Sequence, residues 1–189
     1  MKIIVTILSI SLLVSCNKED TPVPHPNLGN YELISLTSDT ALDLNYDNIK
    51  SENFKEELSV YYTGFRKPMD DLIFTESTYG ANKWYFRLSL PRDFYYPELG
   101  IIDLRYRDGD YSKIVFLKDG KIDRIAHYYY DGLEVDADFF INEHYPYPYD
   151  LTLNSVTMVT VKVKQMFFDL EQDLWVLVNL EAVFEKVVE

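Results

Sequence analysis

Apolar and polar residues alternate with a period of two through most of this 189-residue chain from Tyr31 onward. The pattern is clearest in residues 159–163 and 174–184. Successive side chains of a β-strand point to opposite faces, so this pattern predicts strands with one buried and one solvated face. The residues from 169 to 173 would then join the last two strands as a hairpin.

Further strands are expected at residues 31–38, 58–63, 70–76, 84–90, 102–106, 112–118 and 121–130. An Asp-Gly pair at positions 119 and 120 favours a tight turn between the last two of these. Strands with short connections must close or stack to hide their edges. The prediction is an all-β fold, a single antiparallel meandering β-barrel of eight to nine strands, with a β-sandwich as the alternative. One short helix is expected near Ser51, a good N-cap residue.

Composition limits what can hold this fold together and what it can bind. Cys16 is the only cysteine, so packing must replace disulfides and cysteine-based metal sites. The 16 Tyr, 11 Phe and 2 Trp are residue types that suit a half-buried sheet surface. A formal net charge of -13 repels phosphate backbones and anionic headgroups. This charge argues against nucleic acid as a partner and against electrostatic docking to membranes.

The N-terminus has the features of an export signal. Lys2 precedes an apolar run at residues 3–13, and Ser15 and Cys16 follow. The run is too short for a membrane-spanning helix. The segment resembles a bacterial lipoprotein signal with its lipobox, which implies that Cys16 becomes the lipidated first residue and that the membrane is contacted through this lipid. An ordinary signal peptide with a chance cysteine is the alternative.

The residues after Cys16 are polar and rich in proline, which favours an extended tether. Charged residues directly after the cysteine resemble the export signal of lipoproteins from Bacteroidetes-type bacteria. The resemblance implies a lipid-anchored outer-membrane protein, with the cell surface favoured over the periplasmic face. We therefore expect a signal peptide at residues 1–15, the lipidated cysteine and tether at 16–27, and one barrel domain at 28–189.

Asp43, Asn45 and Asp47 place side-chain oxygens at alternate positions, as positions 1, 3 and 5 of a calcium-binding loop do. Asn48 can take the left-handed conformation that glycine usually takes at position 6. Position 12 is Phe54, which cannot bind a cation. Two interpretations therefore stay open. Either the three side chains bind calcium, or they accept backbone N–H groups in a local turn that needs no metal.

The same region carries a second resemblance. Gly29-Asn30-Tyr31 and the turn at residues 43–47, followed by strands to the C-terminus, resemble the lipocalin-like lipoproteins of Bacteroidetes-type bacteria. The resemblance covers about residues 28–188 and implies a small barrel. Asn48 departs from it, since glycine is usual there. Most members have no established activity, so the resemblance bears on fold more than on function.

The usual sequence signatures of catalysis are missing. The chain contains no nucleophile elbow, no zinc-protease motif, no P-loop and no dinucleotide fingerprint. His127 and His144 are too far apart in sequence to indicate a metal pair by themselves. We expect a protein that is not an enzyme and has no cofactor other than the calcium of the first interpretation above.

Tyr145, Tyr147 and Tyr149 alternate with two prolines. Proline favours an extended, polyproline-like path, and tyrosine offers a ring together with a hydroxyl, as ligand sites often do. These tyrosines are candidate ligand-binding residues in a loop over the barrel mouth. The alternative is aromatic packing that plugs the end of the sheet.

These observations lead to two functional hypotheses. The first is a non-catalytic, lipid-anchored barrel that binds a small apolar or glycan ligand. The second is a structural or protein-interaction subunit of an outer-membrane assembly, with the barrel filled by its own side chains. An eight-stranded barrel permits either.

Overall fold

The computed structural model describes residues 25–58, 72–77, 82–96, 101–106, 112–119, 121–128, 133–142 and 144–188. The strands are β1 (Gly29–Leu42), β2 (Ser51–Asn53), β3 (Leu72–Glu76), β4 (Lys83–Leu88), β5 (Pro91–Tyr96), β6 (Ile101–Tyr106), β7 (Ser112–Lys118), β8 (Lys121–Tyr128), β9 (Tyr147–Leu153), β10 (Met158–Asp169) and β11 (Leu174–Lys186). The helices are α1 (Phe54–Glu57) and α3 (Ala137–Asn142). Within these residues, no helix combines the length and the apolar character that a membrane crossing requires.

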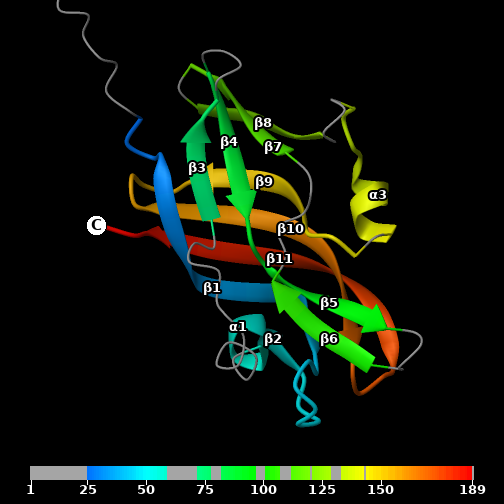
Figure 1. The fold of residues 1–189 in the computed structure, drawn as a ribbon. Coiled ribbons are helices and arrows are strands. Elements are labelled where there is room, and N and C mark those ends of the chain that lie inside the picture. The colour runs from blue at the N-terminus through cyan, green and yellow to red at the C-terminus, as the bar shows by residue number, and fades with distance from the viewer. Residues whose placement is uncertain are drawn as a thin grey trace, which may run out of the picture.

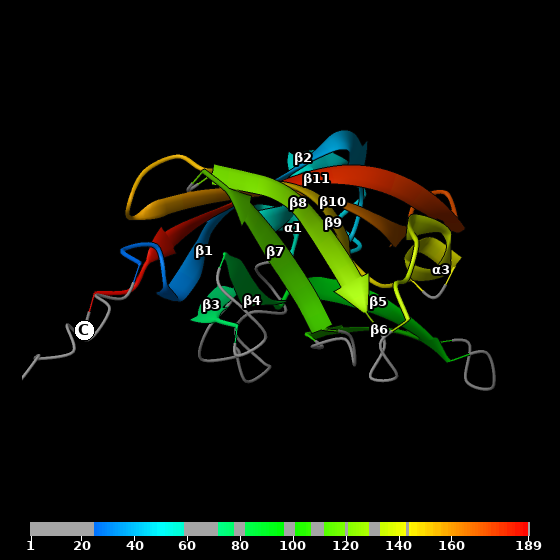
Figure 2. The same ribbon diagram turned by 90° about the horizontal axis from the view of Figure 1, so that it is seen from above.

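Eight antiparallel strands form one curled sheet in the order β8-β7-β4-β3-β1-β11-β10-β9 (Figure 1). Strand β2 pairs with β1, and β5 and β6 form a separate two-stranded sheet. The view from above shows β3, β4 and β7 across from β9, β10 and β11 (Figure 2). The long sheet is a nearly closed barrel, so the predicted antiparallel barrel is confirmed in place of the β-sandwich.

One row of paired residues shows how the barrel closes. Residues directly opposite each other on antiparallel strands point to the same face of the sheet. From β1 across to β8, the row consists of Gly29, Phe74, Phe86, Lys113 and His127. From β9 back to β1, it consists of Pro148, Val163, Leu180 and Ser38. The row leaves β1 at Gly29 and returns at Ser38, and this offset is the stagger that a barrel of tilted strands requires.

The period-two pattern places the core as expected. Alternate residues of β10 from Val159 to Asp169 are all buried, and their neighbours are half-buried. Helix α1 lies at the end of the barrel near the β10–β11 hairpin, and its Phe54 ring meets the edge of Phe167 at 5.2 Å. Away from this helix, the ring of His25 lies 4.6 Å from that of Trp84.

The hairpin predicted near the C-terminus is confirmed, because β10 ends at Asp169 and pairs with β11 from Leu174. The turn after Lys118 is also confirmed, and Asp119 has a φ of 51°. The helix starts later than expected: residues 51–53 form β2, and Asn53 caps α1 through its side chain. The expected strand at residues 58–63 lies almost wholly outside the described residues.

Three elements differ from expectation. Strand β5 and helix α3 were not predicted from the sequence. The Tyr-Pro segment was expected to be a loop, but from Tyr147 onward it is strand β9, paired with β10. Proline is tolerated in a strand at a sheet edge or a bulge, and β9 is an edge strand whose register with β10 shifts next to Val163.

Candidate functional site

The barrel has a seam between its two edge strands, β8 and β9, which in the described residues do not pair through their backbones. The N–H and C=O of one strand residue point to the same side. The carbonyl oxygen of Pro148 lies 2.9 Å from Nε2 of His127 on β8. Pro148 therefore lacks an N–H donor on the edge that faces β8. The His127 side chain thus donates to this β9 carbonyl in place of a backbone N–H of β8.

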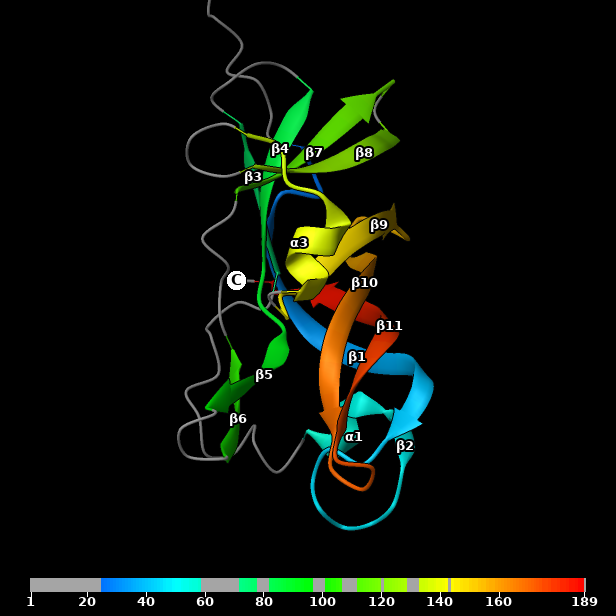
Figure 3. The same ribbon diagram turned by 90° about the vertical axis from the view of Figure 1, so that its right-hand side faces the viewer.

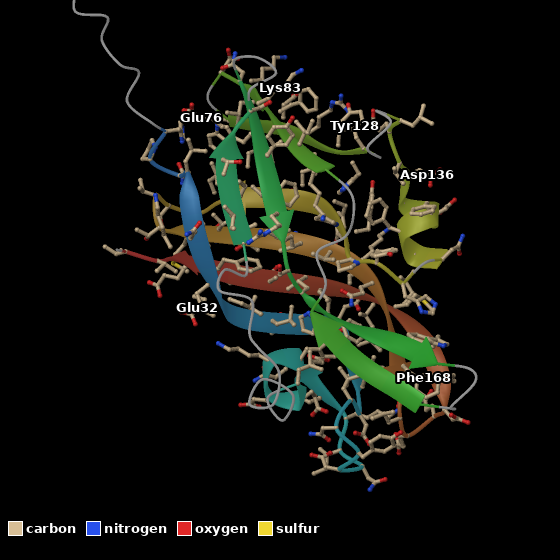
Figure 4. The ribbon with its side chains drawn as sticks, in the orientation of Figure 1. Glu32, Glu76, Lys83, Tyr128, Asp136 and Phe168 are labelled. Atoms are coloured by element: carbon tan, nitrogen blue, oxygen red, sulfur yellow. The ribbon has the colours of Figure 1, made fainter. Side chains whose placement is uncertain are left out.

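The chain between β8 and α3 covers the free edge of β8. The N–H of Val135 donates to the carbonyl of His127 at 2.8 Å, and Glu134 forms a bridge with Tyr128. Figure 3 shows α3 between β8 and β10, beside β9. Figure 4 shows Tyr128 and Asp136 on the same side of the molecule, near the start of α3. The other neighbouring strands of the barrel are joined by backbone ladders. At the seam, a short helix covers the gap between β8 and β9 instead.

Three rings hold the seam together, and we call His127, Phe140 and Tyr147 the seam cluster. The His127 ring lies 5.0 Å from Phe140 and 4.7 Å from Tyr147, and these two rings are 5.4 Å apart. Tyr145 lies 6.4 Å from Phe140 on the other side. The seam is therefore closed by aromatic packing around one hydrogen bond.

Local sequence explains why α3 presents Phe140 to the seam. The carboxylate of Asp136 accepts the N–H of Phe139 at 3.1 Å, the usual contact of an N-cap residue. At the other end, the N–H of Tyr145 donates to the carbonyl of Phe140 at 2.8 Å, and His144 has a φ of 57°. A left-handed residue after the last turn is a common helix stop. The helix is too short to be stable alone and depends on the buried Phe140.

His127 is the most perturbed titratable group of the seam. Its side chain is 2% exposed. Burial lowers the pKa of His127 to about 4, the charge of Lys113 adds to this effect, and the Pro148 carbonyl opposes it. The imidazole is therefore neutral at pH 7. Its proton lies on Nε2, which faces a carbonyl, so Nδ1 is an acceptor, and this atom has no hydrogen-bond partner.

Gln165 is a second buried polar side chain, on the inward face of β10. Its Nε2 donates to the carbonyl of Pro91, the first residue of β5, at 2.8 Å. Its Oε1 has no partner. Like His127, Gln165 donates an N–H to a proline carbonyl, and its remaining acceptor atom has no hydrogen-bond partner.

The structure separates the three predicted ligand tyrosines. Tyr145 and Tyr147 lie at the seam, whereas Tyr149 is 42% exposed on the outside of the barrel. There it borders an open pocket of about 280 Å³. The other side chains that line this pocket come from β1, β10 and β11, and they include Asp39, Lys162, Asn179 and Glu181. Hydrogen bonds from Asn179 hold the pKa of Asp39 below its usual range.

In the loop from Asp43 to Asn48, the predicted calcium ligands accept backbone N–H groups. The buried carboxylate of Asp43 accepts the N–H groups of Asn45 at 3.2 Å, Tyr46 at 2.9 Å and Asn48 at 3.0 Å. Asp47 accepts the N–H of Ile49 at 2.8 Å. Asn48 has the expected left-handed conformation, with a φ of 63°. These are the contacts of the metal-free turn, and calcium binding by Asp43, Asn45 and Asp47 stays a prediction.

A further carboxylate supports this loop. Oε2 of Glu57 accepts the N–H of Leu44 at 3.1 Å, and burial raises the pKa of Glu57, with the negative charges of Asp47 and Asp43 adding to the effect. Among the described residues, no three His, Cys, Asp or Glu side chains form a group arranged to hold a metal ion. Cys16, the predicted lipidation site, lies outside the described residues.

Comparison of the chain with protein-family models, with curated proteins and with solved structures found no match. The site is therefore defined by its geometry.

The sequence pointed to Tyr145 and Tyr147 but not to His127, Phe140 or Gln165 as site residues. The Asp136-Ala137 pair before two phenylalanines was the available signal for α3, because aspartate is a favoured N-cap residue.

We expect the neutral state of His127 to make folding stability depend on pH. The pKa is about 4 in the folded protein and near 6.5 in the unfolded chain, so the unfolded state takes up the proton first as the pH falls. This contribution is complete above pH 6.5 and is lost between pH 6.5 and 4, and the loss at pH 5 amounts to about 2 kcal/mol. Urea unfolding at pH 7 and pH 5 measures it. His127→Phe should lose this pH dependence, whereas His144→Phe should keep it; equal behaviour of wild type and His127→Phe would contradict the assignment.

Calcium binding predicts a higher melting temperature in millimolar calcium than in chelator, because an ion that binds only to the folded state stabilises that state. Asp43→Asn with Asp47→Asn should abolish this rise while keeping one side-chain acceptor oxygen at each position for the turn. Glu52→Gln, just beyond the loop, serves as the control. Identical melting curves of the wild type with calcium and with chelator would leave the metal-free turn as the correct interpretation.

Proposed function

We propose that this protein is a lipid-anchored, lipocalin-like barrel of the kind found in Bacteroidetes-type bacteria, that it binds a small ligand, and that it catalyses no reaction. The observation that carries the proposal is the seam. A nearly closed eight-strand barrel is wide enough either to be filled by its own side chains or to hold one small ligand. At the seam, side-chain contacts replace the backbone ladder, so this side can open without breaking strand pairing.

The chemistry of the seam fits a small apolar or glycan ligand. Phe140, Tyr145 and Tyr147 supply rings, and tyrosine adds a hydroxyl for orientation. Local opening is easiest where few backbone hydrogen bonds must break. Helix α3 is short and packs on the seam through Phe140, so it is the element whose movement would admit a ligand.

The outer-face pocket favours the second function, a protein-interaction subunit of an outer-membrane assembly. Tyr149 is exposed there beside Lys162 and Glu181, and Leu177 is 46% exposed on β11. Exposed tyrosine with mixed charge is typical of a polar interface. In this function the barrel interior would be filled by its own side chains.

Anchoring is proposed to occur through lipid on Cys16, at the outer membrane and on the cell surface. Cys16→Ser should abolish acylation and release the protein from the membrane fraction, because the acidic domain has no electrostatic attraction to anionic lipid. Ser15→Ala is the matched control, since it keeps a small residue before the cysteine. The readouts are intact mass and membrane fractionation, and protease digestion of intact cells reports the exposed face. Unchanged membrane association of Cys16→Ser would rule out this anchor.

Ligand binding is tested by native mass spectrometry of the full-length protein extracted from its own membranes. We expect a discrete added mass that disappears on denaturation. Tyr147→Ala should retain less of this mass than the wild type, Tyr147→Phe should lie between them, and Tyr149→Ala on the outer face should match the wild type. If the wild type carries no added mass, the filled barrel of the second function is the better account.

A further inference from the structure

Two buried acceptors near the seam have no donor in the described structure. They are Nδ1 of His127 and Oε1 of Gln165. Most buried polar atoms of native proteins are hydrogen-bonded, so each exception requires an explanation. A buried acceptor without a donor costs free energy, because it has given up its bonds to water.

Neither side chain can remove the problem by turning over. The donor N–H of each faces a proline carbonyl, at 2.9 Å for His127 and 2.8 Å for Gln165. Rotating the Gln165 amide by half a turn would place Oε1 against the Pro91 carbonyl, and a half-turn of the His127 ring would put Cε1 in place of Nε2 and lose the hydrogen bond to Pro148. The two side chains are therefore fixed so that each offers one acceptor, and both require a donor from outside.

The two acceptors come from the same region of the barrel. His127 bonds to Pro148, Pro148 pairs with Val163, and Gln165 is the next residue on that face of β10. A step of two residues along a strand is about 7 Å. Helix α3 packs against both β9 and β10 and so covers this region. His127 and Gln165 thus lie on β8 and β10, the two strands beside β9.

The charge near this region selects among possible donors. Lys113 pairs with His127 across β7 and β8, and its side chain is buried. A cationic ligand would be repelled by this ammonium group. Neutral donors remain, and hydroxyl groups provide them. Both acceptors are out of contact with solvent, so a donor can reach them only when neighbouring side chains move apart.

We propose, on the basis of the ligand-binding function above, that the ligand is a neutral polyhydroxy compound such as a glycan. It donates one hydroxyl to Nδ1 of His127 and another to Oε1 of Gln165, beneath α3. This assignment chooses the glycan over a purely apolar ligand. The aromatic rings of the seam then pack against the apolar face of the sugar, while the two acceptors read its hydroxyl groups.

The test uses two probes that differ only in donors, octyl β-D-glucopyranoside below its micelle concentration and its tetra-O-methyl derivative. We expect calorimetry to show the glycoside binding at least about tenfold more tightly, since one hydrogen bond of about 1.4 kcal/mol corresponds to tenfold. In protein labelled with ¹⁵N-histidine, the Nδ1 signal of His127 should move to the position of a hydrogen-bonded acceptor with the glycoside alone.

Variants separate recognition from folding. Gln165→Met keeps the size of the side chain and should weaken glycoside binding about tenfold without changing binding of the methylated probe. Met166→Leu, on the other face of the same strand, should bind both probes as the wild type does. Melting curves confirm that each variant is folded.

Three results would overturn the proposal. They are equal binding of the two probes, binding of neither, or a His127 Nδ1 signal that is already hydrogen-bonded without a probe and does not change. The last result would mean that an internal water molecule serves the acceptor. None of these decides whether the barrel carries a ligand at all, because the bound mass in native mass spectrometry answers that question separately.

Discussion

The missing N–H group of Pro148, on the edge of β9 that faces β8, is the constraint around which the seam of this barrel is arranged. In the described residues, β8 and β9 form no backbone ladder there. The barrel instead depends on long pairings elsewhere, above all β10 with β11 and β11 with β1. The open edge of β8 is covered by residues 134–135, and α3 follows directly. An exposed pair of strand edges, which would invite aggregation, is thereby avoided without full closure.

This arrangement gives His127 two roles that conflict. Its Nε2–H replaces a backbone donor and ties β8 to β9, which requires a buried ring between Phe140 and Tyr147. Burial keeps the ring neutral and leaves Nδ1 without a donor. The contact that closes the seam therefore also creates an unsatisfied group within it. A closed state that carries such a group is less favourable than its packing alone would suggest, and this lowers the cost of opening at that place.

Local sequence patterns predicted the parts of the fold that obey local rules. Buried and more exposed residues alternate along β10, which pairs with β11. This pattern therefore predicted the strands, the face of each strand that is buried, and the hairpin that joins them. Strand β9 was missed because prolines usually indicate a loop, and only its pairing with β10 and its position at the edge make them acceptable. Helix α3 was missed because six residues are too few to show a helical period. The tyrosines were identifiable by type, but the roles of His127 and Gln165 depend on carbonyl groups that are remote in sequence.

The two proposed functions differ in what the seam is for. If the barrel is filled and serves an assembly, a seam closed by apolar side chains would pack better, and nothing in that function requires acceptors inside it. Two acceptors that are both fixed by proline carbonyls, one on β8 and one on β10, are costly for stability, and in the proposed binding function they serve recognition. Polar groups that conflict with stability are characteristic of binding sites, where the ligand supplies what the fold lacks. In the proposed binding function, recognition would lie at the side of the barrel beneath α3, because Phe54 of α1 packs on Phe167 and His25 packs on Trp84 elsewhere in the barrel.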